Sequence, residues 1–218
     1  MTTEEIKDRI LSYKAQGKRL FTTSSFQTHS IVLLHIISEV DNSIPVYFLN
    51  TGYLFPETLK FRDEVSAMLG LNVKDLQSVI PKSMQRDHEG KLFFVSDPDH
   101  CCSINKTQPL ENILASHDIW INGVRADQSA ARKAMKVEQS APFGVTRFHP
   151  MLQWNAKSIY EYRKKYNLPS HSMESKGYFS VGCEPCTRRI DPQMQERDSR
   201  WFGMNKTECG LHTELINK

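Results

Sequence analysis

Segments typical of strands alternate with segments of helical periodicity through residues 1–150. Residues 28–38 and the stretch opened by Pro56 have helical spacing, and short β-branched or aromatic runs lie at residues 19–23, 45–50, 71–79 and 119–124. This alternation predicts an α/β fold with a mostly parallel, doubly wound sheet flanked by helices. Because ligands of such folds bind at the carboxyl ends of the strands, we expect the site in the loops that follow them.

The two ends of the chain differ in character. Residues 3–16 have helical spacing, as do residues 156–166, after which Gly and Pro interrupt the sequence repeatedly. The C-terminal end is polar and charged and has few large apolar side chains to anchor it. We therefore expect an α/β domain over residues 1–190, followed by a mobile tail over residues 191–218.

Composition limits the class of protein. At 218 residues with 39% hydrophobic content, the chain is long enough for one sizeable core and short for two domains. A formal net charge of +3 suits a small anionic ligand better than a nucleic acid. No apolar run approaches the ~20 residues of a membrane span, and the N-terminal MTTEEIKDRI is unlike a secretory signal. We expect a soluble, cytoplasmic protein.

Five cysteines divide into two close pairs and one that stands alone. In a reducing cytosol, the spacing of Cys101–Cys102 and Cys183–Cys186 favours metal ligation over structural disulfides. Four thiolates can hold a zinc ion or a [4Fe–4S] cluster, and directly adjacent cysteines are easier to accommodate on the larger group. The structural alternative is that Cys101 and Cys102 are small buried apolar residues.

The fifth cysteine, Cys209, lies in the sequence ECGLH close to the C-terminus. A thiol on a mobile segment can meet two partners in turn, and nearby arginines and His212 would favour its thiolate form. An unreactive cysteine in a tail is the alternative.

Two polar turns are candidates for anion binding. Residues 22–25 are rich in hydroxyls and precede a helix, whose N-terminal N–H groups attract anions. Residues 123–132 follow a strand and contain Arg125 and Arg132. Helix capping and surface charge are the ordinary explanations of such turns.

Several stretches together carry a family resemblance. They are TTSSF at 22–26, LNTGYLFPETL at 49–59, CC with Lys106 at 101–106, GVRADQSAAR at 123–132, GCEPCT at 182–187, and ERDSRW with ECGLH at the end. The chain resembles the phosphoadenylyl and adenylyl sulfate reductase family, specifically its iron–sulfur-containing adenylyl sulfate branch. The resemblance covers most of the chain, from Phe21 to His212.

The resemblance implies an adenine-nucleotide α-hydrolase-like (Rossmann-like) fold, with Cys209 as the nucleophile. The implied ligands of a [4Fe–4S] cluster are Cys101, Cys102, Cys183 and Cys186. The implied groups around the substrate's phosphosulfate are Lys106, Arg197, Arg200 and His212. The loops implied to hold the nucleotide contain Thr23, Ser24, Ser25, Phe26, Leu49, Thr51, Gly52, Tyr53 and Arg125.

The implied reaction is that of an oxidoreductase in assimilatory sulfate reduction and cysteine biosynthesis. The Cys209 thiolate would attack the sulfate sulfur of adenylyl sulfate, expel AMP and become a cysteine S-sulfonate. Thioredoxin or a glutaredoxin-like dithiol would then release sulfite. We expect the cluster to orient Lys106 rather than to carry electrons. Phosphoadenylyl sulfate is the alternative substrate, and the sequence leaves homo-oligomerisation open.

The sequence departs from the family pattern in places. No glycine occurs between Gly17 and Gly52, although the family usually has one just after the Ser-Ser-Phe turn. Asn50 stands where an aspartate is common, and Ser103 and Asn105 stand where basic residues often flank Lys106.

Two other functions are alternatives to this reaction. An ATP-dependent ligase of the same fold needs an SGGxD-type loop, and TTSSFQ lacks both glycines and the carboxylate. A zinc-bearing nucleic-acid-binding module would use the four paired thiols structurally. The colour of the purified protein separates iron from zinc.

Overall fold

A computed structural model describes residues 1–195 and 197–215 of the chain. Its centre is a six-stranded sheet with the strand order β3-β2-β1-β4-β6-β5. Every neighbouring pair is parallel except β5 with β6, which is antiparallel. The strands are β1 (Leu20–Thr23), β2 (Val46–Leu49), β3 (Val73–Leu76), β4 (Ile119–Ile121), β5 (Glu138–Ser140) and β6 (Thr146–Phe148). The predicted α/β fold with a mostly parallel sheet is confirmed.

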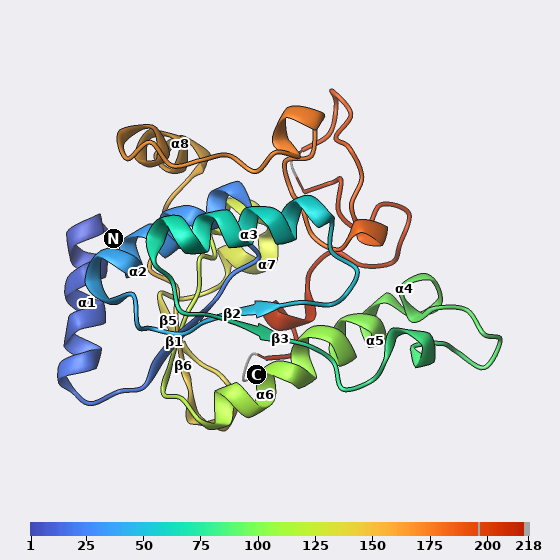
Figure 1. Ribbon diagram of the computed structural model, residues 1–218, viewed down its shortest axis with the longest axis horizontal. Helices are drawn as coiled ribbons and strands as arrows, with labels where there is room; N and C mark the ends of the chain where they lie inside the picture. Colours follow the sequence, from blue (N-terminus) through green and yellow to red (C-terminus); the bar gives the residue numbers. More distant parts are fainter. Residues whose placement is uncertain (196, 216–218) are drawn as a thin grey trace.

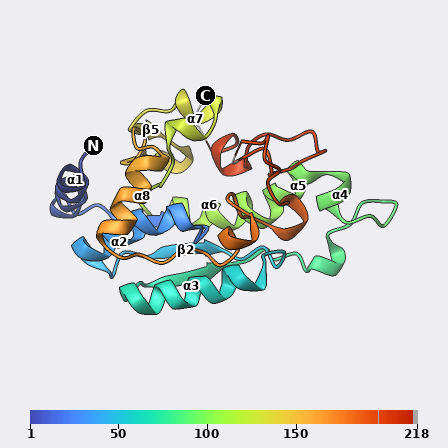
Figure 2. The same ribbon diagram turned by 90° about the horizontal axis from the view of Figure 1, so that it is seen from above.

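Helices cover both faces of this sheet, with α2 and α3 on one side and α6 on the other (Figure 1). Helix α8 lies over α2, on the side of α2 that faces away from the sheet (Figures 1 and 2). The longer helices are α1 (Thr3–Ala15), α2 (Ile31–Asp41), α3 (Pro56–Leu69), α6 (Gln108–Ala115) and α8 (Ala156–Lys165). Shorter ones are α4 (Phe93–Ser96), α5 (Pro98–Cys102) and α7 (Ala130–Lys133). None of the helices in the described ranges is long and apolar enough to cross a membrane.

Local sequence signals explain where the helices begin and end. Thr2 and Glu5 form a capping box at the start of α1, and Asn155 caps α8 by accepting the N–H of Ser158. Pro56 occupies the first turn of α3, where its missing N–H costs nothing. Helix α2 is apolar on nearly all sides and is buried between the sheet and the outer helices.

The predicted strands exist, but two are shorter than expected. The strand expected over residues 71–79 is confined to β3, and the one expected over residues 119–124 ends at Ile121. The residues after β4, Asn122, Gly123 and Val124, leave the sheet and line a pocket instead. The β5–β6 hairpin was not predicted, because its residues lack the apolar alternation of a strand.

The C-terminal segment packs against the domain. Trp201 is buried with Cys183 and Cys186, and Leu215 is buried in a second core beside Phe21 and Trp120. A short 3-10 helix, η8 (Gly210–His212), lies against η3 (Ser103–Thr107), a single π-helical turn between α5 and α6. The segment thus crosses the end of the sheet at which the parallel strands finish (Figure 1).

Candidate active site

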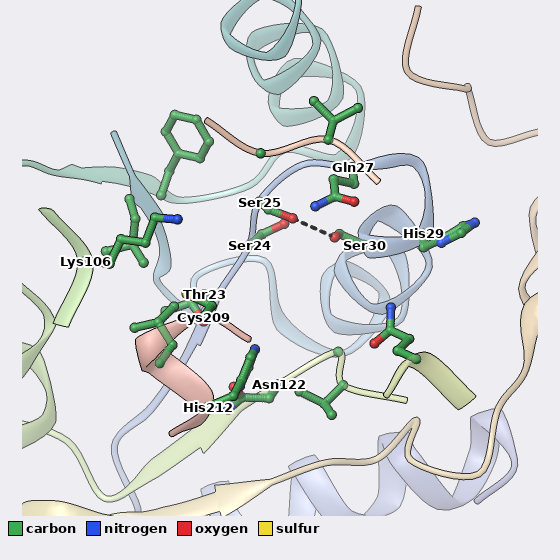
Figure 3. Close-up of a pocket in the computed structure, with 18 of the residues that line it drawn as sticks. Thr23, Ser24, Ser25, Gln27, His29, Ser30, Lys106, Asn122, Cys209 and His212 are labelled. Carbon is green, nitrogen blue, oxygen red and sulfur yellow. Dashed lines mark hydrogen bonds between the residues drawn. The ribbon is translucent and has the colours of Figure 1, made fainter. Parts of the chain in front are cut away.

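A pocket of about 200 Å³ lies at the carboxyl ends of β1, β2 and β4. Its lining comes from the loops after these strands, from η3 and from the C-terminal segment (Figure 3). This is the position that the doubly wound topology predicts, because the loops diverge there and leave a crevice. Cys209 and His212 face the pocket from opposite ends of η8.

One side of the pocket is formed by the hydroxyl-rich loop after β1. Thr23, Ser24 and Ser25 line it, and Ser24 accepts the backbone N–H of Phe26 at 3.0 Å. Phe26 itself is buried against Phe48 and adopts φ +50°, in the left-handed region that favours glycine. The turn therefore forms without the glycine usual in the family, with a buried aromatic ring fixing it.

Four cationic side chains line the other side, around the lone cysteine. They are Lys106 on η3, Arg132 on α7, and Arg197 and Arg200 in the C-terminal segment. Burial alone would lower the pKa of Lys106, but the nearby thiols of Cys183, Cys209 and Cys102 outweigh it and raise the pKa. A positively charged Lys106 is thus favoured wherever those thiols ionise.

The Cys209 thiol has a strongly perturbed environment. A hydrogen bond donated by the Cys102 thiol lowers the pKa of Cys209 well below its usual value, against the opposing effect of burial. The charge of Lys106 and the backbone N–H of Leu211 act in the same direction. The pKa of Cys102 rises correspondingly, because its proton is held in that hydrogen bond. Lys106, Arg200 and the Leu211 N–H favour the Cys209 thiolate whether or not Cys102 carries a proton.

Glu208, next to this cysteine, is buried in a cluster of donors. Arg132 binds its carboxylate with two hydrogen bonds of 2.9 Å, Arg197 adds one of 2.9 Å and Ser129 one of 3.0 Å. The N–H of Cys209 also donates to it at 3.0 Å. Burial would raise the pKa of Glu208, but the two arginines lower it to about 2. Sequence reasoning missed this role, although Glu208 stands in the ECGLH stretch.

His212 is held among positive charges. Burial, followed by the charges of Arg132, Arg147 and Arg197, lowers the pKa of His212 well below 6.5. The ring is therefore neutral near pH 7. The sequence predicted that nearby arginines and His212 would stabilise the Cys209 thiolate. Arg200 does supply positive charge to it and Lys106 adds more, whereas the neutral His212 does not.

The four paired cysteines lie together in an adjoining pocket, whose lining also includes Thr51, Tyr53 and Lys106. All four are buried. Burial, and then the thiols of Cys183 and Cys186, raise the pKa of Cys101 to about 11. Two polar side chains contact the sulfurs: the Oγ1 of Thr51 lies 3.2 Å from the Sγ of Cys183, and the amide nitrogen of Asn105 donates to the Sγ of Cys101 at 3.7 Å.

The four thiols are the donors that a zinc ion or an iron–sulfur cluster would meet in this pocket. Within residues 1–195 and 197–215, no three His, Cys, Asp or Glu side chains are arranged to hold one metal ion. The four thiols face a shared, mainly apolar pocket, and soft thiolate donors of this kind bind zinc and iron–sulfur groups. The positive charge of Lys106 beside them would complement the net negative charge of such a thiolate-bound group.

The remaining predicted nucleotide residues fall in different places. Leu49 lines the pocket with Thr23, Ser24 and Ser25, whereas Thr51 and Tyr53 line the cysteine pocket. Gly52 contacts Lys82, whose ammonium donates to its carbonyl. Arg125 is buried and paired with Asp127 at 3.0 Å, and like Phe26 it is outside the lining. The roles of these residues in nucleotide binding stay predictions.

Comparison with known proteins then identifies the family. Residues 19–189 match the phosphoadenosine phosphosulfate reductase domain. The chain belongs to this family. Among similar reductases, the adenosine 5'-phosphosulfate reductase of Bacillus cytotoxicus is 36% identical over 205 residues, covering 93% of this chain and 88% of its own length.

Solved structures agree on the fold of this reductase family member. The phosphoadenylyl-sulfate reductase of Candida auris, a phosphate complex, has a TM-score of 0.68 at 19% identity, covering 82% of this chain and 88% of its own. The FMN adenylyltransferase of Candida glabrata has a TM-score of 0.58 at 15% identity, covering 92% and 66%. The adenine-nucleotide α-hydrolase-like fold is therefore confirmed.

Proposed function

We propose that this chain is a dithiol-dependent adenylyl sulfate reductase, which converts adenylyl sulfate to sulfite and AMP in sulfate assimilation. The observation that carries the proposal is the position of Cys209, whose thiol faces a pocket between a hydroxyl-rich loop and four cations. Family membership and the names of its relatives support the same reaction. A thioredoxin-type donor implies a reducing compartment, and we propose the cytoplasm.

In the first step, the Cys209 thiolate attacks the sulfate sulfur of adenylyl sulfate. A sulfur–sulfur bond forms, the bond between that sulfur and the bridging oxygen breaks, and AMP leaves with the electron pair. Lys106 and Arg200 flank the thiol and would offset the charge that develops on the departing phosphate. Because these cations are fixed before the substrate arrives, little reorganisation is needed in the transition state. The product is a cysteine S-sulfonate.

In the second step, a thiolate of a thioredoxin-type dithiol attacks the Cys209 sulfur. Sulfite leaves with the electron pair of the sulfur–sulfur bond, and a mixed disulfide forms. The second thiol of the donor then displaces Cys209 as a thiolate. The dithiol loses two electrons and the sulfur gains them, so the balance needs no further redox group.

The two steps require Cys209 to be enclosed and then accessible, so we propose that residues 191–218 act as a mobile catalytic tail on a nucleotide-binding domain of residues 1–190. The contacts of the docked segment support this proposal. It is held by side-chain contacts, namely the pairs Glu208–Arg132 and Lys206–Asp99 and the packing of Trp201 and Leu215. Such contacts can be exchanged without unfolding the domain.

We propose that Cys101, Cys102, Cys183 and Cys186 bind a [4Fe–4S] cluster. When bound, the cluster supplies a fixed charge beside the pocket and does not supply the reaction's electrons. The shared wall of the two pockets supports this role, because Lys106 lines both and Cys183 lines both. Lys106 would be oriented between the cluster ligands and the substrate's anionic groups.

The distribution of charge supports adenylyl sulfate over phosphoadenylyl sulfate. All four lysine and arginine side chains in the described lining surround Cys209, where the phosphosulfate would lie. The rest of the lining is polar or apolar, including Gln27, Ser30 and Leu34. A 3′-phosphate bound there would lack a strong cationic partner.

The deciding experiment is a single turnover on anaerobically purified protein, without a dithiol. We expect AMP release and a covalent SO₃ adduct that mass spectrometry places on Cys209. Adding thioredoxin should then release sulfite in equal amount. Cys209→Ser should abolish both products and keep the iron absorption, and the absence of any adduct in wild-type protein would overturn the proposed function.

A further inference from the structure

Arg147 is a fully buried cation that takes no part in the mechanism described above. It lies on β6 with no exposed surface, and its guanidinium stacks 4.3 Å from the ring of Trp120. Within the described part of the chain it has no Asp or Glu as a charge partner, and burial lowers its pKa to about 10. A buried cation without a paired carboxylate is costly even though the Cys209 thiolate favours its charge, which indicates a specific task for Arg147.

The hydrogen bonds of Arg147 run mainly to the C-terminal segment. It donates to the carbonyl of Leu211 at 2.9 Å and to that of Leu215 at 3.3 Å. Its Nη2 also lies 3.0 Å from the Nδ1 of His212 and 3.3 Å from the Oδ1 of Asn122. The same guanidinium thus contacts the backbone that carries η8 and the ring of a pocket-lining side chain.

The direction of the contact with His212 follows from chemistry. A guanidinium has only donors, so the Nδ1 at 3.0 Å must accept and cannot carry a proton. The remaining proton of a neutral imidazole then lies on Nε2. Figure 3 shows the ring directed into the pocket beside Cys209.

We infer that Arg147 is a positioning residue that holds His212 as the neutral Nε2–H tautomer, so that His212 donates a hydrogen bond to an oxygen of the substrate's phosphosulfate. This inference rests on the proposed function for the identity of the acceptor. It also assigns His212 a role as a donor and excludes one as the base that deprotonates Cys209. Arg132, Arg197 and His149 face the same ring, and the two arginines oppose a second positive charge on it.

The first test is ¹⁵N NMR of protein labelled with ¹⁵N-histidine, with the His212 signals assigned from the spectrum of His212→Gln. In the wild type we expect a proton on Nε2, none on Nδ1, and no charging of the ring between pH 6 and 8. Arg147→Gln, whose amide can donate or accept, should give a mixture of both tautomers. A proton on Nδ1, or a doubly protonated ring at pH 7, would overturn the inference.

A matched substitution controls for general effects of removing a buried guanidinium. Arg163 on α8 is half-buried, and it donates to a backbone carbonyl, that of Pro169 at 3.2 Å, away from the pocket. Arg163→Gln should leave the His212 tautomer unchanged. If Arg147→Gln does not fold, the wild-type spectrum still decides where the proton lies.

The second test uses two amides that imitate the two ring nitrogens. The amide nitrogen of Gln reaches the position of Nε2, and that of Asn the position of Nδ1. We expect His212→Gln to keep the rate of AMP release within about tenfold of the wild type, and His212→Asn to lose about a hundredfold. Equal losses, or a better Asn variant, would contradict a donor at Nε2. The NMR test needs no substrate, so it separates failure of this inference from failure of the proposed function.

Discussion

Glu208 connects the nucleophile to the cations of the pocket. Its carboxylate accepts the N–H of Cys209 and binds Arg132 and Arg197, so one side chain sets the position of the thiol and offsets part of the positive charge around it. Motif resemblance drew attention to the neighbouring cysteine and histidine. No local pattern indicates the role of the glutamate, because its partner Arg132 lies 76 residues away in sequence.

The first prediction concerns the amide variant of this residue. Glu208→Gln cannot accept the full set of charge-assisted hydrogen bonds, so we expect the rate of S-sulfonate formation to fall about tenfold to a hundredfold. Rapid-quench single turnovers measure that rate. Glu214→Gln, an exposed change in the same segment, should stay near wild type. An unchanged rate in Glu208→Gln would show that the thiol is positioned by other contacts.

A second prediction follows from the pKa of this carboxyl, which lies at about 2 instead of 4.5. Because the folded protein depresses the pKa, the ionised carboxylate stabilises the fold above the usual value. That contribution disappears as the pH falls from 4.5 toward 2. Urea denaturation of wild type and Glu208→Gln should therefore differ most near neutral pH and converge in acid. A difference that grows on acidification would have the wrong sign.

At the scale of elements, the π-helical turn η3 is the feature that joins the two pockets. It follows α5 directly, so Cys101, Cys102 and Lys106 lie within one and a half turns of helical chain. Asn105 stands where the family often has a basic residue, and it bonds instead to Gln85 through a pair of amide contacts of 3.0 and 2.8 Å. In place of a basic side chain, this chain therefore has a buried pair of hydrogen bonds that links η3 to the preceding loop.

The third prediction tests the hydrogen bonds between Asn105 and Gln85. Both amides are buried, so Asn105→Ala leaves the Oε1 of Gln85 without its donor, while the Nε2 keeps its bond to the carbonyl of Ile80. The change should cost about 1–3 kcal/mol of stability. It should also speed the loss of visible iron absorption in air, because Asn105 contacts Cys101. Gln85→Ala and the double variant complete a cycle. Additive losses would mean that the two amides do not act together.

The elements themselves were largely predictable from sequence, and the reasons differ from one to another. Helix α8 follows a capping Asn155, and β2 is a run of buried apolar residues, so local signals sufficed. The β5–β6 hairpin has no such pattern, since its pairing is fixed by the neighbouring β4. The π-turn and the partner of Arg147 depend on contacts between distant segments, which no local pattern encodes.

At the scale of the whole molecule, positive charge gathers at the end of the pocket that Cys209 occupies. The fourth prediction follows from this uneven distribution of charge along the pocket. With thioredoxin as donor, sulfite release from adenylyl sulfate should exceed that from phosphoadenylyl sulfate by about tenfold or more in kcat/KM. The reason is that the four lysine and arginine side chains of the described lining gather around Cys209, which leaves none for the extra phosphate. Equal efficiency would require a cation from outside that lining.

Lys106 and Cys183 stand in both pockets, so the two sites have a common boundary. If the proposed cluster is bound at the four thiols, its loss would remove negative charge beside Lys106, and the end of the substrate pocket that meets the phosphosulfate would change with it.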